Sequence, residues 1–245
     1  MEEKKQFQGY LECDGTIVKI SSIEDIERFI CRFGKTTNDI SELDIDELLN
    51  KDGETIIDDC GVCYITNPLL LKRGASIESY KIKEGTLVVS NNAFSFNNGK
   101  LKSVFIPDTV VGIGSSAFSN QSLSNLRLSE ILIKIGDYAF NNCSNLSSVS
   151  LPSTLKYIGK NAFKKCSITQ IVIPKSVRTI GAHAFSDNTL LNQVVFEGVP
   201  KEISSGIFDN CKSLKTIIVP SGTKDYFVKE LFPMEHDIII EQSEV

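Results

Sequence analysis

Alanine, phenylalanine and large aliphatic residues recur with a period of about 23 positions over more than half of the chain. The pair Ala-Phe occurs five times and Ile-Phe follows once, with successive Phe residues 24, 22, 23, 22 and 23 positions apart. These Phe residues are Phe94, Phe118, Phe140, Phe163, Phe185 and Phe208. Twelve positions before each of them stands another large apolar residue: Ile82, Ile106, Leu128, Leu151, Ile173 and Phe196, with Val219 continuing the column. Columns that keep their phase in this way predict a repeat protein, whose units stack and bury their apolar sides against each other.

The residues upstream of the large apolar column predict one short strand in each unit. Their pattern is L-x-x-V-x-I, as in Leu101, Val104 and Ile106. Side chains alternate along a strand, so we expect the pattern residues to enter the core and those between them to point outward. Proline follows the strand in four units and ends it, because proline has no N–H for the ladder. A glycine column, Gly114, Gly136, Gly159 and Gly181, predicts a turn that needs a positive φ or close packing.

Three segments carry the most complete copies of the unit: residues 105–110 (FIPDTV), 158–166 (IGKNAFKKC) and 180–185 (IGAHAF). They resemble the BspA-like leucine-rich repeat family, whose unit reads approximately I-P-x-x-V-x-x-I-G-x-x-A-F-x-x-C-x-x-L. The resemblance covers about residues 77–222. It implies a β-rich leucine-rich-repeat solenoid of right-handed parallel coils. Members of the family are often bacterial surface proteins implicated in adhesion and protein binding.

The pattern divides the chain into three regions. Residues 1–76 lack the repeat and have 9 basic and 16 acidic side chains, hence a net charge of −7. We expect a small α+β capping region there, with a hairpin about Asp14-Gly15, helices over 22–34 and 41–53, and strands at 56–57 and 62–65. We expect residues 77–222 to form a solenoid of about seven units, and residues 223–245 to form a C-terminal cap with a helix within 223–232 and a strand at 238–240. The first region is alternatively a separate binding module.

Composition excludes several classes of protein. With 41% hydrophobic residues, 23% charged residues and a net charge of −5, the 245-residue chain is typical of a folded protein and unlike a nucleic-acid binder. No apolar run reaches the ~18–20 residues that a membrane span needs. The segment from Met1 to Gln6 has no apolar signal core behind it, so we expect a cytoplasmic location and reduced thiols for the seven Cys. The family resemblance leaves a cell-surface location open.

Two outward columns of the predicted strands form the candidate binding face. One is polar throughout: Ser79, Ser103, Asn125, Ser148, Gln170, Gln193 and Thr216. The other is half apolar: Lys81, Phe105, Arg127, Ser150, Val172, Val195 and Ile218. We hypothesise that this face binds a protein partner through Phe105, Arg127, Gln170, Val172, Gln193, Val195 and Ile218. Alternatively, β-branched residues simply suit a strand ladder, or the face forms a contact in a weak homodimer of an otherwise monomeric chain.

The search for catalytic or metal-binding chemistry yields little. Cys60 and Cys63 have the only metal-like or redox-like spacing, and a buried strand thiol is the alternative interpretation. Cys143, Cys166 and Cys211 stand three positions after a repeat Phe, where Asn188 also stands, which indicates a structural position. His183 shares a column with Ser116, Tyr138 and Asn161, a mixture typical of solvent.

These observations predict a non-enzymatic interaction scaffold with no cofactor and no bound metal. The alternative from a different class is an adhesin-like or glycan-binding surface protein. A third hypothesis, an enzyme within residues 1–76, needs a nucleophile–base pair that the sequence does not reveal.

Overall fold

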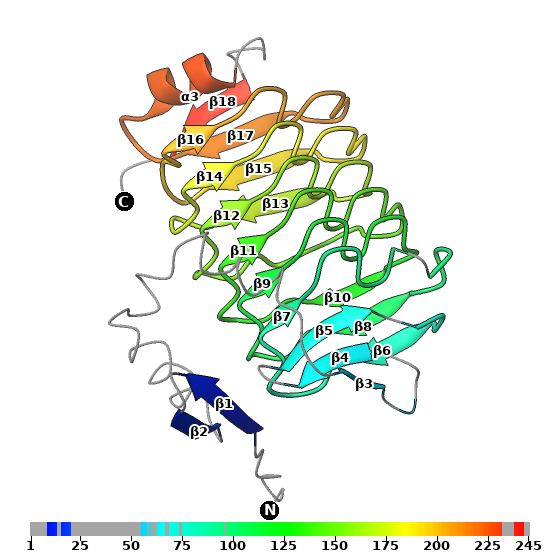
Figure 1. Ribbon diagram of the computed structural model, residues 1–245. Helices are drawn as coiled ribbons and strands as arrows, with labels where there is room; N and C mark the ends of the chain where they lie inside the picture. The colour runs from blue at the N-terminus through cyan, green and yellow to red at the C-terminus, as the bar shows by residue number, and fades with distance from the viewer. Residues whose placement is uncertain are drawn as a thin grey trace, which may run out of the picture.

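The computed structural model describes residues 9–13, 16–20, 55–57, 59, 63–66, 69–73, 75–95, 97–231 and 238–242. Over the repeat region the chain winds in about seven coils of about 23 residues that stack into an elongated solenoid (Figure 1). Each complete coil passes through a strand of one sheet, turns, passes through a two-residue strand of a second sheet, and returns through the Ala-Phe turn. The predicted leucine-rich-repeat solenoid is therefore confirmed.

The first sheet consists of parallel strands that follow the L-x-x-V-x-I pattern. Among the described residues it comes in two parts, ordered β10-β8-β6 and β13-β15-β17-β18. Its strands are β6 (Ser79–Lys81), β8 (Ser103–Phe105), β10 (Asn125–Arg127), β13 (Gln170–Ile173), β15 (Gln193–Phe196), β17 (Thr216–Val219) and β18 (Ile239–Glu241). We call the outer surface of these strands the strand face.

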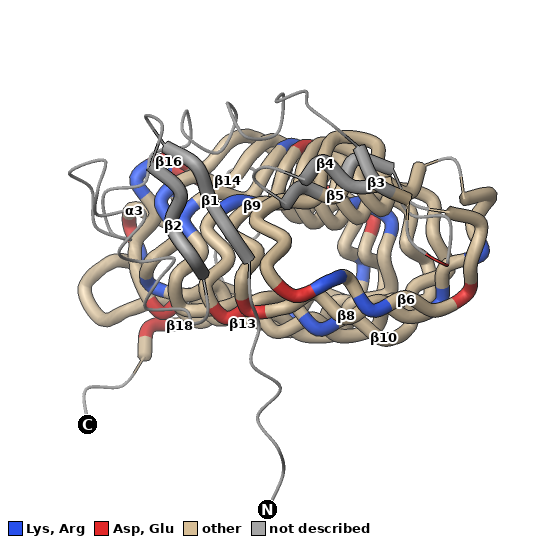
Figure 2. Tube along the Cα trace, turned by 60° about the horizontal axis from the view of Figure 1, so that its bottom comes forward, with Lys and Arg blue, Asp and Glu red and all other residues tan. Residues whose placement is uncertain are grey.

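The second sheet runs along the opposite side of the coils (Figure 2). Within the described part of the chain its order is β16-β14-β12-β11-β9-β7-β5-β4-β3. Its strands are β3 (Thr55–Ile57), β4 (Cys63–Thr66), β5 (Leu69–Arg73), β7 (Val88–Val89), β9 (Gly112–Ile113), β11 (Lys134–Ile135), β12 (Tyr157–Ile158), β14 (Thr179–Ile180) and β16 (Glu202–Ile203). From β5 to β16 all neighbours are parallel, which is the pattern of a solenoid.

The phenylalanine column forms a continuous stack through the core. Rings of successive coils from Phe94 to Phe185 lie 5.2–5.4 Å apart, with planes within 4–13° of parallel. Phe208 continues the stack at 6.0 Å. Burying each ring contributes roughly 2–3 kcal/mol, so this stack is a major source of the stability.

Close packing, and not a positive φ, explains the glycine column. A Cβ at Gly159 would lie 2.5 Å from the main-chain nitrogen of Asp137 in the preceding coil, and one at Gly136 would lie 2.7 Å from Ser115 N. The φ angles of these glycines are not in the left-handed region. Only hydrogen therefore fits at this position without separating the coils.

The first sheet is interrupted where the fourth unit should contribute a strand. Residues 148–150 form no strand, and Val149 in the middle of the segment is only partly buried. The segment from Ser147 to Ser150 offers a single β-branched side chain among three serines, so both the strand propensity and the buried area are small.

The strands predicted near the N-terminus are present. β1 (Gly9–Cys13) and β2 (Thr16–Ile20) pair antiparallel with Cys13 opposite Thr16, which is the predicted hairpin. β3 and β4 correspond to the strands expected at 56–57 and 62–65. The helices expected over 22–34 and 41–53 lie outside the described residues. β5 pairs antiparallel with β4 and parallel with β7, so the second sheet continues from residues 55–73 into the solenoid.

The C-terminal segment contains the expected helix and strand. Helix α3 (Lys224–Glu230) packs Phe227 against Phe196 of the last coils, with ring centres 4.6 Å apart. The Tyr226 hydroxyl donates to the Pro200 carbonyl at 2.7 Å. A carboxylate oxygen of Glu241 in β18 accepts the N–H of Lys224 at 2.9 Å and so joins the two elements.

Candidate binding surfaces

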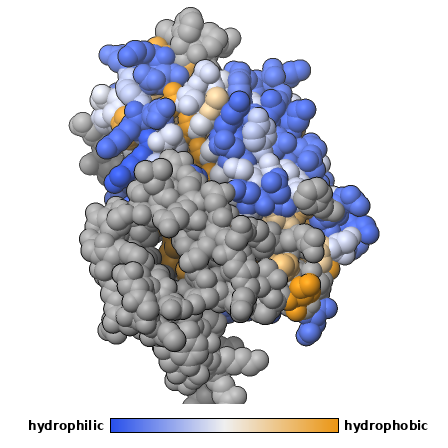
Figure 3. Space-filling model, in the orientation of Figure 1, coloured by the Kyte–Doolittle hydropathy of each residue, from blue (hydrophilic) through white to orange (hydrophobic). Residues whose placement is uncertain are grey.

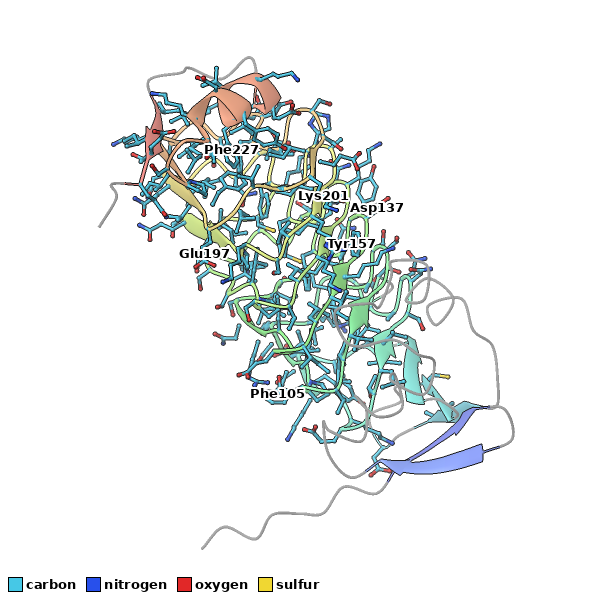
Figure 4. The ribbon with its side chains drawn as sticks, turned by 90° about the vertical axis from the view of Figure 1, so that its left-hand side faces the viewer. Phe105, Asp137, Tyr157, Glu197, Lys201 and Phe227 are labelled. Atoms are coloured by element: carbon cyan, nitrogen blue, oxygen red, sulfur yellow. The ribbon has the colours of Figure 1, made fainter. Side chains whose placement is uncertain are left out.

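The N-terminal part of the strand face is a charged cluster around one aromatic ring. Lys81 Nζ lies 5.0 Å and Arg127 Cζ lies 4.9 Å from the centre of the Phe105 ring. Arg127 Nη2 also lies 2.6 Å from a carboxylate oxygen of Asp108, whose hydrogen bond raises the pKa of the guanidinium. Figure 4 shows Phe105 on the opposite side of the solenoid from Asp137 and Tyr157. Because cations of neighbouring strands already contact Phe105, its ring is a poor platform for a ligand.

The C-terminal part of the strand face is an aliphatic row. Val172 of β13 lies opposite Val195, Val195 opposite Ile218, and Ile218 opposite Ile240 of β18. Val172 is 46% exposed and Ile240 is 50% exposed, whereas Val195 and Ile218 are half-buried between them. Four adjacent strands thus present one branched aliphatic side chain each, and we call these four residues the aliphatic row.

A polar row runs beside the aliphatic row. Gln170 and Gln193 lie opposite each other on β13 and β15, and Thr216 follows on β17. The seven predicted binding residues all lie at outward strand positions, but they fall into two groups. Phe105 and Arg127 contact each other, and Gln170, Val172, Gln193, Val195 and Ile218 form the second group. Ser148 and Ser150 separate the groups, in the unit that forms no strand.

Ile240 was missed as a member of the aliphatic row. The sequence predicts the strand at 238–240, but these residues lie outside the repeat, so no period fixes their register against β17. The alternation of the three isoleucines is also uninformative, because all three are equally apolar.

The Ala-Phe turns form a polar edge between the two sheets. Two columns there have positive φ although their residues are not glycine. The first column precedes Ala-Phe and contains Asn92, Ser116, Tyr138, Asn161 and His183; the second follows it and contains Asn120, Asn142, Lys165, Asp187 and Asn210. The repeated asparagine is the sequence signal for these positions, because Asn tolerates the left-handed region better than most residues. The mixture of residues in the His183 column predicts only exposure to solvent and gives no sign of a depression.

A depression of about 450 Å³ lies between these two columns, over four successive coils. Tyr138, Asn161 and His183 of the first column and Asn142 and Lys165 of the second are among its lining residues. His183 Nδ1 lies 3.3 Å from a carboxylate oxygen of Asp209. Figure 3 shows that the side of the molecule carrying these turns is mostly hydrophilic. This depression is the second candidate surface.

The cysteines of the repeat occupy a buried position three residues after a repeat Phe, which we call the slot, and their thiols are not accessible to reagents or ligands. Each thiol is close to the carbonyl oxygen of the Phe in the preceding coil, at 3.2 Å for Cys143 and 3.3 Å for Cys166 and Cys211. Asn188 donates to the same type of carbonyl at 2.8 Å, and Gln121 does so at 3.0 Å. Burial raises the pKa of Cys143 and Cys211 to about 12. The predicted structural role of this position is confirmed.

The described residues contain no group of three or more His, Cys, Asp or Glu that could hold a metal ion. Cys63 is a half-buried free thiol in β4, and Cys60 lies outside the described residues. None of the described helices is long and apolar enough to cross a membrane.

Comparison with known proteins identifies the repeat. The family model described as "BspA type Leucine rich repeat region" matches residues 71–192 and 111–235, in six copies. A leucine-rich repeat protein from Bacteroides ovatus is 27% identical with a TM-score of 0.53, over 69% of this chain and 49% of that one. The leucine-rich repeat protein of T. pallidum is 22% identical with a TM-score of 0.56, over 75% of this chain and 95% of that one.

A leucine-rich cell surface protein from Faecalibacterium prausnitzii is 23% identical with a TM-score of 0.49, over 74% of this chain and 43% of that one. The chain thus spans about half of the B. ovatus protein and less than half of the F. prausnitzii protein. Among curated proteins there is no match.

Proposed function

Because this chain belongs to the BspA-type leucine-rich repeat family, we propose that it is a non-enzymatic scaffold that binds a protein partner through its strand face. The family is one of repeat scaffolds typical of bacterial surface proteins. A solenoid of this kind offers an extended surface and no deep reactive pocket, which suits binding to another macromolecule. The binding residues that we propose are Gln170, Val172, Gln193, Val195 and Ile218. We propose only an edge contact for the other two predicted residues, Phe105 and Arg127, which lie at the far end of the same face and contact each other.

The aliphatic row carries this proposal. In earlier coils the same outward column holds Lys81, Phe105, Arg127 and Ser150, with no branched aliphatic residue, and it then changes to valine and isoleucine in four adjacent strands. A general preference of strands for β-branched residues would apply to every coil, so it does not explain this change. An apolar row beside glutamine and threonine side chains has the composition of an interface with an apolar centre and a polar rim.

The experiment compares two double variants that make the same chemical change on different surfaces. V172K/V195K places two lysines in the aliphatic row. L190K/V199K places two lysines at exposed aliphatic positions away from the strand face, since Leu190 is 53% and Val199 43% exposed. Partners captured by cross-linking are identified by mass spectrometry, and their binding to purified protein is then measured.

We expect wild type and L190K/V199K to bind the partner equally, and V172K/V195K to lose at least tenfold in affinity, about 1.4 kcal/mol. V172K/V195K should melt somewhat lower than L190K/V199K, because Val195 is half-buried whereas the other three side chains are exposed. Equal binding by all three proteins would reject the strand face.

For the two ends of the chain, we propose that residues 1–76 and 223–245 act as caps of the 77–222 solenoid. The continuous pairing of β3, β4, β5 and β7 supports this role at one end. The burial of Phe227 and Leu231 supports it at the other. A terminal coil without such a cover would expose its apolar core to water.

An adhesin-like or glycan-binding protein at the bacterial surface is our second candidate. Tyr138 favours it, because this exposed aromatic ring lies among amide side chains on the turn edge. Protease treatment of intact cells separates the two candidates. A chain that is digested only after lysis is cytoplasmic and contradicts the surface role.

A further inference from the structure

We propose that the depression on the turn edge, around Tyr138, Asn161 and Lys165, binds an acidic saccharide. This inference rests on our second candidate function, glycan binding, and names the class of sugar; it is independent of the scaffold function. The turn edge lies between the two sheets, whereas the scaffold function uses the strand face, so the two sites can be tested separately.

The depression has a fixed shape because backbone hydrogen bonds between coils hold its walls. Tyr138 N donates to Lys160 O at 2.7 Å, Asn161 N to Ala182 O at 2.9 Å, and His183 N to Ser205 O at 3.1 Å. Asn142 N and Lys165 N donate in the same way to the next coil, at 2.7 and 3.0 Å. Lining side chains from adjacent coils therefore keep a constant spacing, and a ligand would need little reorganisation of the backbone.

Asn161 brings an amide without a protein partner to the depression. The residue is 5% exposed, and its side chain makes no hydrogen bond with the described residues. Within the described part of the chain the buried side-chain polar atoms without a partner are Ser90 Oγ and Ser186 Oγ, so the Asn161 amide keeps contact with solvent. Asn188, in the neighbouring buried column, shows the contrast, because its amide nitrogen donates to the carbonyls of Phe163 and Phe185. The Asn161 amide lines the depression, so its free donors and acceptor are available there.

The charges around the depression leave one cation unpaired. Lys164 lies 3.3 Å from a carboxylate oxygen of Asp187. Partial burial raises the pKa of Asp187, but the hydrogen bonds from Asn210 and Lys164 outweigh this effect. The net result is a lowered pKa, so this carboxylate is charged at neutral pH. Lys165 has no carboxylate of a described residue within ion-pair distance, although its charge also helps to lower the pKa of Asp187, and no carboxylate lines the depression itself. An anionic ligand is therefore favoured over a neutral or cationic one.

The remaining lining groups favour a saccharide over a small inorganic anion. A volume of about 450 Å³ lies in the range of ligand sites and is too large for one phosphate or sulfate. Four asparagine amides line the depression. The amide nitrogen of Asn142 donates to Asn120 Oδ1 at 2.9 Å, and the other donors and acceptors of these amides match sugar hydroxyls. Tyr138 is 37% exposed and offers an apolar ring face with a polar tip. Together with Lys165, these groups fit a sugar that carries a carboxylate.

The test uses variants whose new residues already occur in the same column of other coils. Y138N and K165N each place asparagine where Asn161 or Asn142 stands in a neighbouring coil, and N161S copies Ser116. Because asparagine tolerates a positive φ, Y138N and K165N should fold at least as stably as wild type. K175N is the matched charge control, since Lys175 is exposed in the turn that joins β13 to β14, at the other edge of the coil.

Binding of a hyaluronan tetrasaccharide, which carries glucuronic acid, is measured by isothermal titration calorimetry on the full chain. Maltotetraose and inorganic sulfate are the neutral and purely anionic comparisons. We expect binding of the uronic tetrasaccharide only, weakened about tenfold or more by Y138N, N161S and K165N and unchanged by K175N. Higher salt should weaken wild type more than K165N.

Several results would overturn the proposal. No binding of the tetrasaccharide by wild type would do so, as would sulfate binding with the same affinity. Equal loss of binding in K175N would show a general electrostatic attraction and no specific site.

Discussion

At the scale of single residues, one position of the repeat donates the same hydrogen bond with different side chains. The position three residues after each Phe of the stack, from Phe118 to Phe208, holds Gln121, Cys143, Cys166, Asn188 or Cys211, and each of these side chains donates to the carbonyl of the Phe in the preceding coil. Residue identity is free within this slot, but a buried donor is required, because an unmatched carbonyl in the core is costly.

This requirement gives a prediction for Asn188. Besides its two bonds to Phe carbonyls, its side-chain oxygen accepts the N–H of Ile168 at 3.1 Å. N188A removes these three bonds and a longer one of 3.5 Å to Ser186 O, so we expect a loss of about 2–4 kcal/mol in the free energy of unfolding. C166A removes one weak thiol bond and should cost less, about 1–2 kcal/mol. Urea denaturation measures both.

T189A, at the exposed neighbouring position, is the control and should lie within about 0.5 kcal/mol of wild type. If N188A were no more destabilising than C166A, the donor explanation of the slot would be wrong.

At the scale of elements, regular features were predictable from the sequence and exceptions were not. The spacing of Phe118, Phe140 and Phe163 fixed the coil length and the core stack, because every coil must bury the same face. The two columns with positive φ could be predicted only indirectly, because the repeated asparagines must first be interpreted as a sign of left-handed backbone angles. The interruption at 148–150 and the pairing of β18 with β17 depend on competition between strand propensity and packing, which one unit alone does not reveal.

The glycine column tests how strictly the coil spacing is set. In G159A the new Cβ would meet the backbone of Gly136 and Asp137 at 2.5 Å. Neither backbone can move without breaking hydrogen bonds between coils, so we expect a loss of about 3 kcal/mol or more. G222A tests the alternative cause, a positive φ, by itself. Gly222 has a φ of +72°, and a Cβ there would meet nothing within 4 Å. The variant should lose only about 1–2 kcal/mol.

Circular dichroism melting of both variants, with wild type beside them, measures the difference. A larger effect of G222A than of G159A would mean that backbone conformation, and not coil spacing, governs the glycine positions.

At the scale of the whole molecule, equivalent positions of successive coils line up along the solenoid, so each side of the coil forms a separate surface. The strand face repeats outward strand residues, and the turn edge repeats left-handed residues between the sheets. A ligand of either surface contacts several coils at once, so recognition depends on which residues successive coils place in one column. The candidate strand-face residues could be found from the sequence for this reason, whereas the depression required the backbone angles and the burial of Asn161.

The buried thiols of three coils make the stability of the whole stack depend on pH. Burial raises the pKa of Cys143 and Cys211 to about 12 and that of Cys166 well above its ordinary value of 9.0. The folded state therefore keeps three protons that the unfolded state loses above pH 9. Stability is fully present below pH 9 and falls as the pH rises toward 12, by on the order of 1.4 kcal/mol per thiol at pH 10.

The variant C143S/C166S/C211S separates this effect from other alkaline titrations, because serine keeps a donor for each Phe carbonyl and does not ionise in this range. Between pH 8 and pH 10 we expect urea denaturation to show a clear loss of stability in wild type and a much smaller one in the triple variant. Tyr226, whose pKa burial also raises, is present in both proteins and contributes equally. A parallel decline in the two proteins would place the alkaline sensitivity outside the thiol column, and the burial of these cysteines would then have no effect on the energetics of the stack.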